Sequence, residues 1–102
     1  MAREKLDPNR ITTALQERPG WSLVRDGEAI ERKYVFANFS EAFAFMTRSA
    51  LAAEKLDHHP EWFNVYRKVD VLLTTHSSDG VTELDLELAR LMDEAAGPNS
   101  NH

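Results

Sequence analysis

The sequence predicts a single α+β domain over residues 1–102, with a four-stranded antiparallel sheet that carries three helices on one face. The hydrophobic pattern alternates between helical and strand periods, in the order helix, hairpin, helix, hairpin, helix. A short motif, Pro19-Gly-Trp21 and Pro60-Glu-Trp62, twice follows a helical pattern and opens a hairpin. The chain has 102 residues, 42% hydrophobic and 28% charged, as expected of one globular domain. Two helix–hairpin units and a final helix would together form the two layers of this fold.

The first helix and hairpin are bounded by clear local signals. The helix begins at Asp7-Pro8, an N-cap followed by proline at the first helical position. Pro19 and the glycine after it end the helix. The hairpin then has a strand over residues 21–25, a turn at Asp26-Gly27 and a return strand over residues 29–37.

The second helix is the longest predicted element. Ser40 is its expected N-cap, and it runs to about His58 because Pro60 cannot continue a helix. The positions of its apolar residues have the helical period. The expected buried stripe consists of Ala42, Phe43, Met46, Ala50, Ala53 and Leu56.

The second hairpin and the last helix complete the domain. We predict strands over residues 62–66 and 69–75, joined by a tight turn. The last helix begins at Thr82, and Asp85 three residues later makes a capping-box pattern. Residues 97–102 are expected to form a disordered polar tail. The core stripe of the last helix is expected to be Leu84, Leu88, Leu91 and Ala95.

Composition and charge exclude several classes of function. The net charge is −5, from 12 basic and 17 acidic residues, which argues against direct nucleic-acid binding. The absence of cysteine excludes disulfides and thiolate chemistry. No apolar run approaches the length of a membrane span, and the N-terminal residues lack a hydrophobic signal region. These features predict a cytoplasmic protein.

The histidines suggest where chemistry takes place. Three of the four lie in two short segments, His58-His59-Pro60 and Thr75-His76. Imidazole is the side chain whose ordinary pKa suits proton transfer near neutral pH, so we expect general acid–base catalysis. Glu54 precedes His58 by four residues, and on a helix the two side chains share a face, where the carboxylate would orient the imidazole. A nucleophile motif of the Gly-x-Ser-x-Gly type is absent.

Other interpretations of these residues remain open. Glu54, His58 and His76 could form a two-histidine, one-carboxylate metal site. The His-x3-His spacing of helical metal sites is absent, however, and Glu-x3-His is common by chance, so we expect no metal. Trp21 could pack in the core or offer a flat face at the rim of a cleft. Asp85 is expected first to cap its helix.

The chain also resembles a known family, the pterin-4a-carbinolamine dehydratases. The shared motif is Glu54-x3-His58-His59-Pro60-Glu-Trp62-x-Asn-Val-Tyr66, followed by Thr75-His76, Gly80 and Asp85. The segment Pro19-Gly-Trp21 fits as well, and the resemblance covers nearly the whole chain. It implies the fold deduced above from periodicity.

The resemblance implies a reaction and a set of site residues. The reaction is dehydration of 4a-hydroxytetrahydropterin to quinonoid dihydropterin, which recycles the cofactor of aromatic amino-acid hydroxylases. A general acid would protonate the leaving hydroxyl and a base would take the proton from N5. The pterin is the substrate, and no further cofactor or metal is implied. The catalytic histidines of the family fall on His58, His59 and His76. Its substrate contacts and supporting carboxylates fall on Pro60, Thr75, Ser77, Ser78, Glu54 and Asp85, to which we add Trp21.

The resemblance further implies partners. Family members form homodimers or homotetramers with sheets that continue across a contact, and some act as dimerisation cofactors of a transcription regulator. The strand over residues 62–66 is the candidate seam, because it is uncharged and has apolar groups on both faces. Alternatively, this strand lies inside the sheet and is covered by its neighbours.

Overall fold

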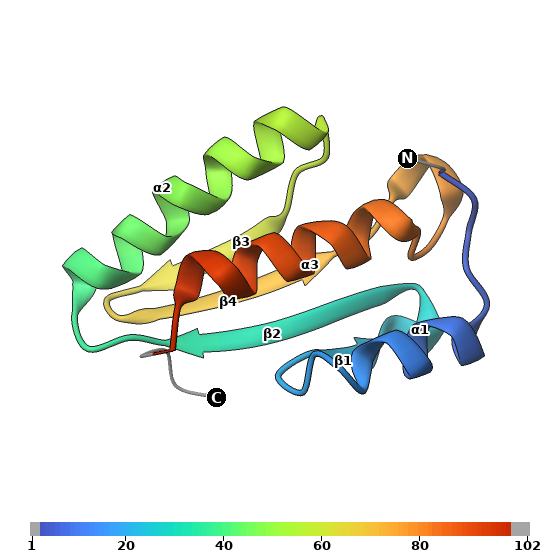
Figure 1. The fold of residues 1–102 in the computed structure, drawn as a ribbon, viewed down its shortest axis with the longest axis horizontal. Helices are drawn as coiled ribbons and strands as arrows, with labels where there is room; N and C mark the ends of the chain where they lie inside the picture. The colour runs from blue at the N-terminus through green and yellow to red at the C-terminus, as the bar shows by residue number, and fades with distance from the viewer. Residues whose placement is uncertain (1–2, 99–102) are drawn as a thin grey trace.

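The structure, a computed structural model, describes residues 3–98 and shows the predicted single α+β domain (Figure 1). The order of the main elements is α-β-β-α-β-β-α, as predicted. Two short 3₁₀ turns follow β1 and β4. The elements are α1 (Pro8–Leu15), β1 (Ser22–Val24), η1 (Arg25–Gly27), β2 (Ala29–Val35), α2 (Phe39–Leu56), β3 (Glu61–Val65), β4 (Lys68–Leu73), η2 (His76–Ser78) and α3 (Glu83–Ala96).

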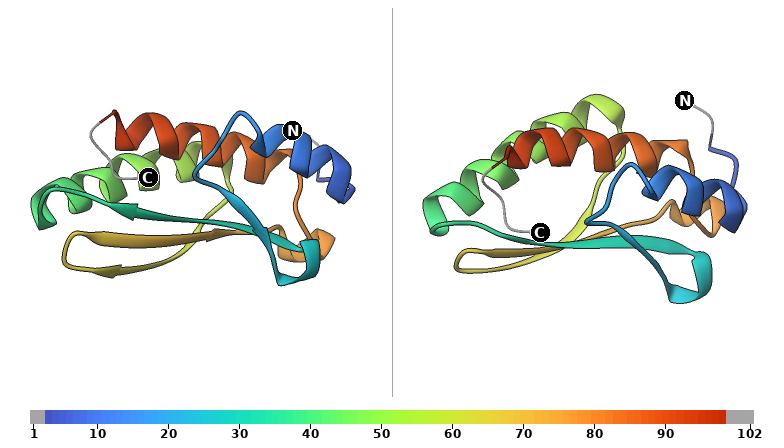
Figure 2. Two further views of the ribbon diagram at one scale, coloured as in Figure 1. Left: turned by 90° about the horizontal axis from the view of Figure 1, so that it is seen from below. Right: turned by 60° about the horizontal axis from the view of Figure 1, so that its bottom comes forward.

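The sheet is antiparallel throughout, with the strand order β1-β2-β4-β3. The long central pair is β2 and β4, and β3 lies at one edge. The interpretation that places β3 inside the sheet is therefore wrong. Figure 2 shows the helices gathered on one face of the sheet, and none of the described helices covers the other face.

The core lies between the inner face of the sheet and the helices. Val69, Val71 and Leu73 of β4 are buried at alternate positions, as strand periodicity requires. Tyr34 of β2 packs against Phe45 of α2, with ring centroids 4.5 Å apart. Burial of these large apolar groups is the main favourable contribution to folding.

Local hydrogen bonds set the ends of α2, and both differ from the prediction. Asn38 is the N-cap, since its Oδ1 accepts from the backbone N–H of Glu41 at 2.9 Å, so the assignment of Ser40 is wrong. The helix ends at Leu56, before the predicted His58. Asp57 then takes a left-handed conformation with φ of 52°, which turns the chain away from the helix axis.

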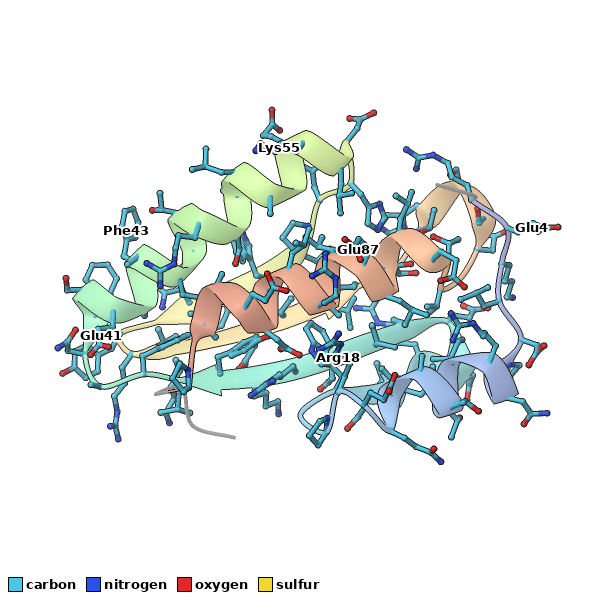
Figure 3. The ribbon with its side chains drawn as sticks, in the orientation of Figure 1. Glu4, Arg18, Glu41, Phe43, Lys55 and Glu87 are labelled. Atoms are coloured by element: carbon cyan, nitrogen blue, oxygen red, sulfur yellow. The ribbon has the colours of Figure 1, made fainter. Side chains whose placement is uncertain are left out.

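The buried faces of the helices are also shifted from the predicted stripes. Phe43 and Ala50 of α2 are exposed, and Figure 3 shows Phe43 pointing away from α3. In α3, Leu91 and Ala95 are only partly buried. Neighbouring apolar residues fit two helical stripes equally well, and packing against the sheet decides between them. The buried residues are Ala42, Phe45, Ser49 and Ala53 in α2, and Leu84, Asp85, Leu88, Ala89 and Met92 in α3.

The second hairpin is displaced by one residue from the prediction. Its strand β3 starts at Glu61, and its turn is at Tyr66-Arg67, where Tyr66 has a φ of 52°. The side-chain amide of Asn64 holds this turn by donating to the carbonyls of Tyr66 (3.1 Å) and Lys68 (2.8 Å). The strand β4 ends at Leu73, two residues before the predicted end. Glu61 consequently belongs to the sheet and not to the loop before it.

The end of α3 is as predicted, with Gly97 at its C-cap. The predicted disordered tail extends over residues 97–102, of which 99–102 lie outside the described part of the chain. None of the described helices has the length and apolar character needed to cross a membrane.

Candidate active site

The two histidine-bearing segments meet at one end of the sheet. His58, His59 and Pro60 form the connection from α2 to β3, whereas Thr75 and His76 follow β4. Because β3 and β4 are antiparallel neighbours, the start of one lies beside the end of the other, and Glu61 pairs with Leu72. Sequence reasoning identified both segments, and the sheet topology brings them together (Figure 1).

His58 and Asp85 form a buried pair. The imidazole Nε2 lies 2.5 Å from Asp85 Oδ1, and the two side chains are 8% and 0% exposed. The other carboxylate oxygen accepts from the hydroxyl of Thr75 at 2.8 Å and from the backbone N–H of Thr82 at 2.9 Å. The second of these bonds completes the predicted capping box of α3. One carboxylate therefore joins the end of α2, the end of β4 and the start of α3.

The hydroxyl and the backbone N–H of Thr75 both form hydrogen bonds within the protein interior. Thr75 is buried, and its hydroxyl also lies 2.8 Å from the hydroxyl of Thr82. Its backbone N–H donates to the carbonyl of Gly80 at 2.9 Å, closing the loop that contains His76. Thr75 thus shapes this loop through both its side chain and its backbone.

His59 and His76 form exposed pairs with glutamates. His59 Nε2 lies 2.7 Å from Glu54 Oε1, and His76 Nε2 lies 2.8 Å from Glu61 Oε2. The imidazoles are 56% and 80% exposed. Glu61 was not identified from the sequence as a site residue.

The predicted pairing of Glu54 with His58 is wrong. It assumed that the helix continues through His58, but α2 ends at Leu56 and Asp57 is left-handed. The backbone N–H of His58 donates to the carbonyl of Ala53 at 3.1 Å, and its side chain turns inward to Asp85. The next residue, His59, then lies beside Glu54.

The carboxylates set the tautomers of both exposed imidazoles. An ionised carboxylate can only accept, so Nε2 carries the proton that His59 and His76 donate. No hydrogen bond from within residues 3–98 is made to Nδ1 of either ring. Each Nδ1 is therefore available to take up or release a proton at the surface.

The N-terminal segment forms hydrogen bonds beside both histidine-bearing segments. The hydroxyl of Ser78 donates to the backbone carbonyl of Arg3, and the Arg3 guanidinium donates to the carbonyl of Asp57 at 3.4 Å. The backbone N–H of Leu6 donates to the carbonyl of Val81 at 2.8 Å. No local sequence pattern indicates these contacts. Of the remaining predicted contacts, Ser77 is exposed in η2 and Pro60 is partly buried before β3.

Trp21 does not join the histidines. It is buried, and its indole N–H donates to Asp93 Oδ1 at 3.0 Å, two turns of α3 beyond Asp85. The same oxygen accepts from Arg32 at 2.8 Å and from the Tyr34 hydroxyl at 2.5 Å. Burial, followed by this hydrogen bond to Asp93, raises the pKa of Tyr34 above its ordinary value. Trp21 therefore belongs to a separate polar cluster beneath α3.

The site is open to solvent. His76 lines a hollow of about 120 Å³ together with Arg25, Glu28, Thr74 and Asp79. Among the described residues, no three histidine or acidic side chains converge in a way that could hold a metal ion. The arrangement can supply proton donors and acceptors from the two exposed imidazoles.

Comparison with known proteins assigns the family. A family model described as pterin 4 alpha carbinolamine dehydratase matches residues 4–95. A relative named for this family in Chelativorans sp. (strain BNC1) is 62% identical over 96 residues, which cover 94% of this chain and 98% of the relative. A second, in Mesorhizobium japonicum, is 61% identical over 97 residues, covering 95% and 99% of the two chains.

A solved structure extends the comparison to the fold. The crystal structure of a transcriptional coactivator/pterin dehydratase from Brucella melitensis has a TM-score of 0.89 and 53% sequence identity. The match covers 92% of this chain and 100% of that one. The fold and the family together define a hydro-lyase. The chain belongs to the pterin 4 alpha carbinolamine dehydratase family.

Proposed function

We propose that the protein dehydrates 4a-hydroxytetrahydropterin to quinonoid dihydropterin and water, with His59 and His76 as the proton-transfer groups. One observation carries this assignment. Two exposed imidazoles are each held through Nε2 by a glutamate, and no group in residues 3–98 forms a hydrogen bond to Nδ1, which can exchange a proton. Family membership supplies the substrate class.

The reaction needs one proton donor and one proton acceptor. Protonation of the 4a-hydroxyl lets it leave as water, and loss of the N5 proton allows the new double bond between C4a and N5. One proton is consumed and one is released, so a protonated and a neutral imidazole together complete the cycle. Glu54 and Glu61 stabilise whichever imidazole is charged.

The other predicted site residues take supporting roles in this proposal. His58 and Asp85 fix the connections that position His59 and His76. Contact of the substrate with Pro60, Ser77 and Ser78 stays a prediction, as does contact with Trp21, whose buried position does not favour it. Recycling of the pterin cofactor of aromatic amino-acid hydroxylases and a cytoplasmic location also stay predictions.

Turnover of a 4a-hydroxytetrahydropterin by purified variants tests this function. His59→Ala and His76→Ala should each lower kcat by about 10²–10⁴, the usual effect of removing a positioned acid or base. His102→Ala is the control histidine variant and should retain the turnover of the unmodified protein. Wild-type turnover in folded His59→Ala and His76→Ala would contradict the assignment.

We propose homo-oligomerisation through the edge of β3. Phe63 and Val65 are exposed on this edge strand and Tyr66 is exposed in the turn that follows it, and the strand has open hydrogen-bonding groups along one side. A second copy could extend the sheet across a two-fold axis, giving a homodimer and, by further contacts, a homotetramer.

Sedimentation equilibrium tests the assembly. Val65→Lys should shift the protein towards its 11.6 kDa monomer. The control is Val35→Lys, since Val35 and Val65 both pair with Lys68, but Val35 belongs to β2, which β4 separates from the β3 edge. An active wild-type monomer at micromolar concentration would exclude the proposed assembly.

A role as dimerisation cofactor of a transcription regulator is the second candidate function. The Brucella melitensis protein is described as a transcriptional coactivator, and α2 here exposes Phe39 and Phe43, with ring centroids 5.8 Å apart. A Phe43→Glu variant that keeps full turnover should lose any such role. If regulator-dependent transcription is unchanged by this variant, the α2 surface is not responsible.

A further inference from the structure

Glu61 makes a long-range contact with the candidate active site. Its Oε2 lies 2.8 Å from Nε2 of His76, fifteen residues further along the chain. Glu61 is the first residue of β3 and pairs with Leu72 across the sheet, so its backbone is fixed by the ladder. His76 begins the 3₁₀ turn η2, and its side chain is 80% exposed. The contact thus connects an ordered strand to a histidine with little packing of its own.

We infer that Glu61 is a positioning residue, which holds His76 in the tautomer protonated on Nε2 and directs Nδ1 towards the substrate. This inference rests on the proposed function of His76 as a proton-transfer group. The tautomer of a histidine is set by the hydrogen bond at its other nitrogen, and here Glu61 makes that bond. Glu61 itself would not contact the substrate.

The two exposed pairs differ in how they are built. Glu54 and His59 are five residues apart, at a helix end and in the connection that follows it. Their contact is local and does not depend on the sheet. The contact of Glu61 with His76 exists only when β3 is paired with β4. Orientation of His76 is therefore tied to correct formation of the hairpin.

Nearby carboxylates explain why His76 needs a specific hydrogen-bond partner. His76 lines a hollow together with Glu28 and Asp79, so other carboxylate acceptors lie in its neighbourhood. Without Glu61, the imidazole would be free to turn towards them, and the tautomer and the direction of Nδ1 would change. An exposed ion pair contributes little to stability, so this change should leave folding intact.

The test combines nitrogen NMR with kinetics. In ¹⁵N-histidine-labelled protein, the ring-nitrogen shifts of His76 report its tautomer directly. Glu61→Ala should shift the tautomer ratio away from Nε2–H and lower kcat/KM by about tenfold or more, the scale seen for partners that orient metal-bound histidines. Glu61→Gln keeps an acceptor and should recover part of both losses. Unfolding midpoints should match the wild type.

Glu31→Gln is the matched control. Glu31 also pairs with Leu72, from the other side of β4, so it lies in the same row of the sheet as Glu61. This variant should leave the His76 shifts and kcat/KM unchanged. Wild-type His76 nitrogen shifts in Glu61→Ala would overturn the inference. If the wild-type protein lacks turnover, the proposed function fails, while the NMR readout still decides whether Glu61 holds His76.

Discussion

His58 and His59 are neighbours in the chain, yet they occupy opposite environments. Each imidazole places Nε2 against a carboxylate oxygen, at 2.5 Å for Asp85 and 2.7 Å for Glu54. The first pair is buried, whereas the side chains of the second are 56% and 75% exposed. Loss of one partner from a buried pair leaves an unsatisfied polar group, but an exposed pair is replaced by water at little cost. The same chemical pair therefore supports the fold in one place and is available for chemistry in the other.

The backbone between α2 and β3 produces this difference. Asp57 is left-handed and ends the helix, so His58 turns inward and His59 outward. Pro60 favours extended backbone at His59 and leads directly into β3. The opposite directions of His58 and His59 therefore depend on the helix ending before them.

The largest expected effect is on the free energy of unfolding, when the buried pair of His58 and Asp85 is broken. Asp85→Ala removes the acceptor for His58, Thr75 and the backbone of Thr82. We expect a loss of about 3–5 kcal/mol in the free energy of unfolding, measured by urea denaturation. Glu83→Ala, in the same first turn of α3 but with a side chain that is 37% exposed, should cost under about 1 kcal/mol. Equal stability of the two variants would contradict the conclusion that the Asp85 carboxylate holds these segments together.

A smaller effect is expected on the exposed side. Glu54→Ala removes the group that holds His59 Nε2 and should lower kcat/KM by about tenfold without a change in unfolding free energy. Glu41→Ala, an exposed glutamate in the first turn of the same helix, serves as control. A loss of stability without a loss of turnover would show that Glu54 acts structurally.

Ser78 tests the link between the N-terminal segment and the site. Its hydroxyl donates to the carbonyl of Arg3, and Ser78→Ala should cost about 0.5–1.5 kcal/mol, the usual net contribution of one hydrogen bond. Ser77→Ala is the control for stability, because Ser77 is exposed in the same turn. If only turnover falls in Ser78→Ala, with stability unchanged, Ser78 contacts substrate instead.

Chelation should have no effect on turnover. The imidazoles supply the proton chemistry proposed above, and metal independence stays a prediction. The measurement is activity after extensive dialysis against EDTA, with elemental analysis of the protein. Stoichiometric zinc or iron, with activity lost to chelator and restored by that metal, would replace acid–base catalysis with metal catalysis.

The sequence predicted the element order and the two histidine-bearing segments because both depend on local patterns. The alternation of Val69, Val71 and Leu73 and the Thr82–Asp85 capping box need only short stretches of chain. The phase of α2 could not be predicted in this way, because Phe43 and Phe45 both fit an apolar stripe. Packing of Phe45 against Tyr34 decides which of them is buried.

The partners of the histidines were harder to predict because they depend on backbone geometry. Pairing of Glu54 with His58 followed from helical spacing, and the left-handed Asp57 invalidates that spacing. Glu61 is brought to His76 by the β3–β4 hairpin, and no fixed spacing indicates such a contact. Long-range contacts of this kind need the strand order and the exact start of β3.

The central claim is that His58 supports the fold and His59 transfers a proton. Parallel measurement of kcat and unfolding free energy for His58→Ala and His59→Ala tests it most directly. We predict that His58→Ala lowers the free energy of unfolding by about 1–3 kcal/mol, because buried polar groups are left unpaired. Any loss of turnover in this variant should occur together with that loss of stability. His59→Ala should lose about 10²–10⁴ in kcat at the wild-type unfolding free energy. Equal destabilisation of the two variants, or wild-type turnover in His59→Ala, would contradict this division of roles.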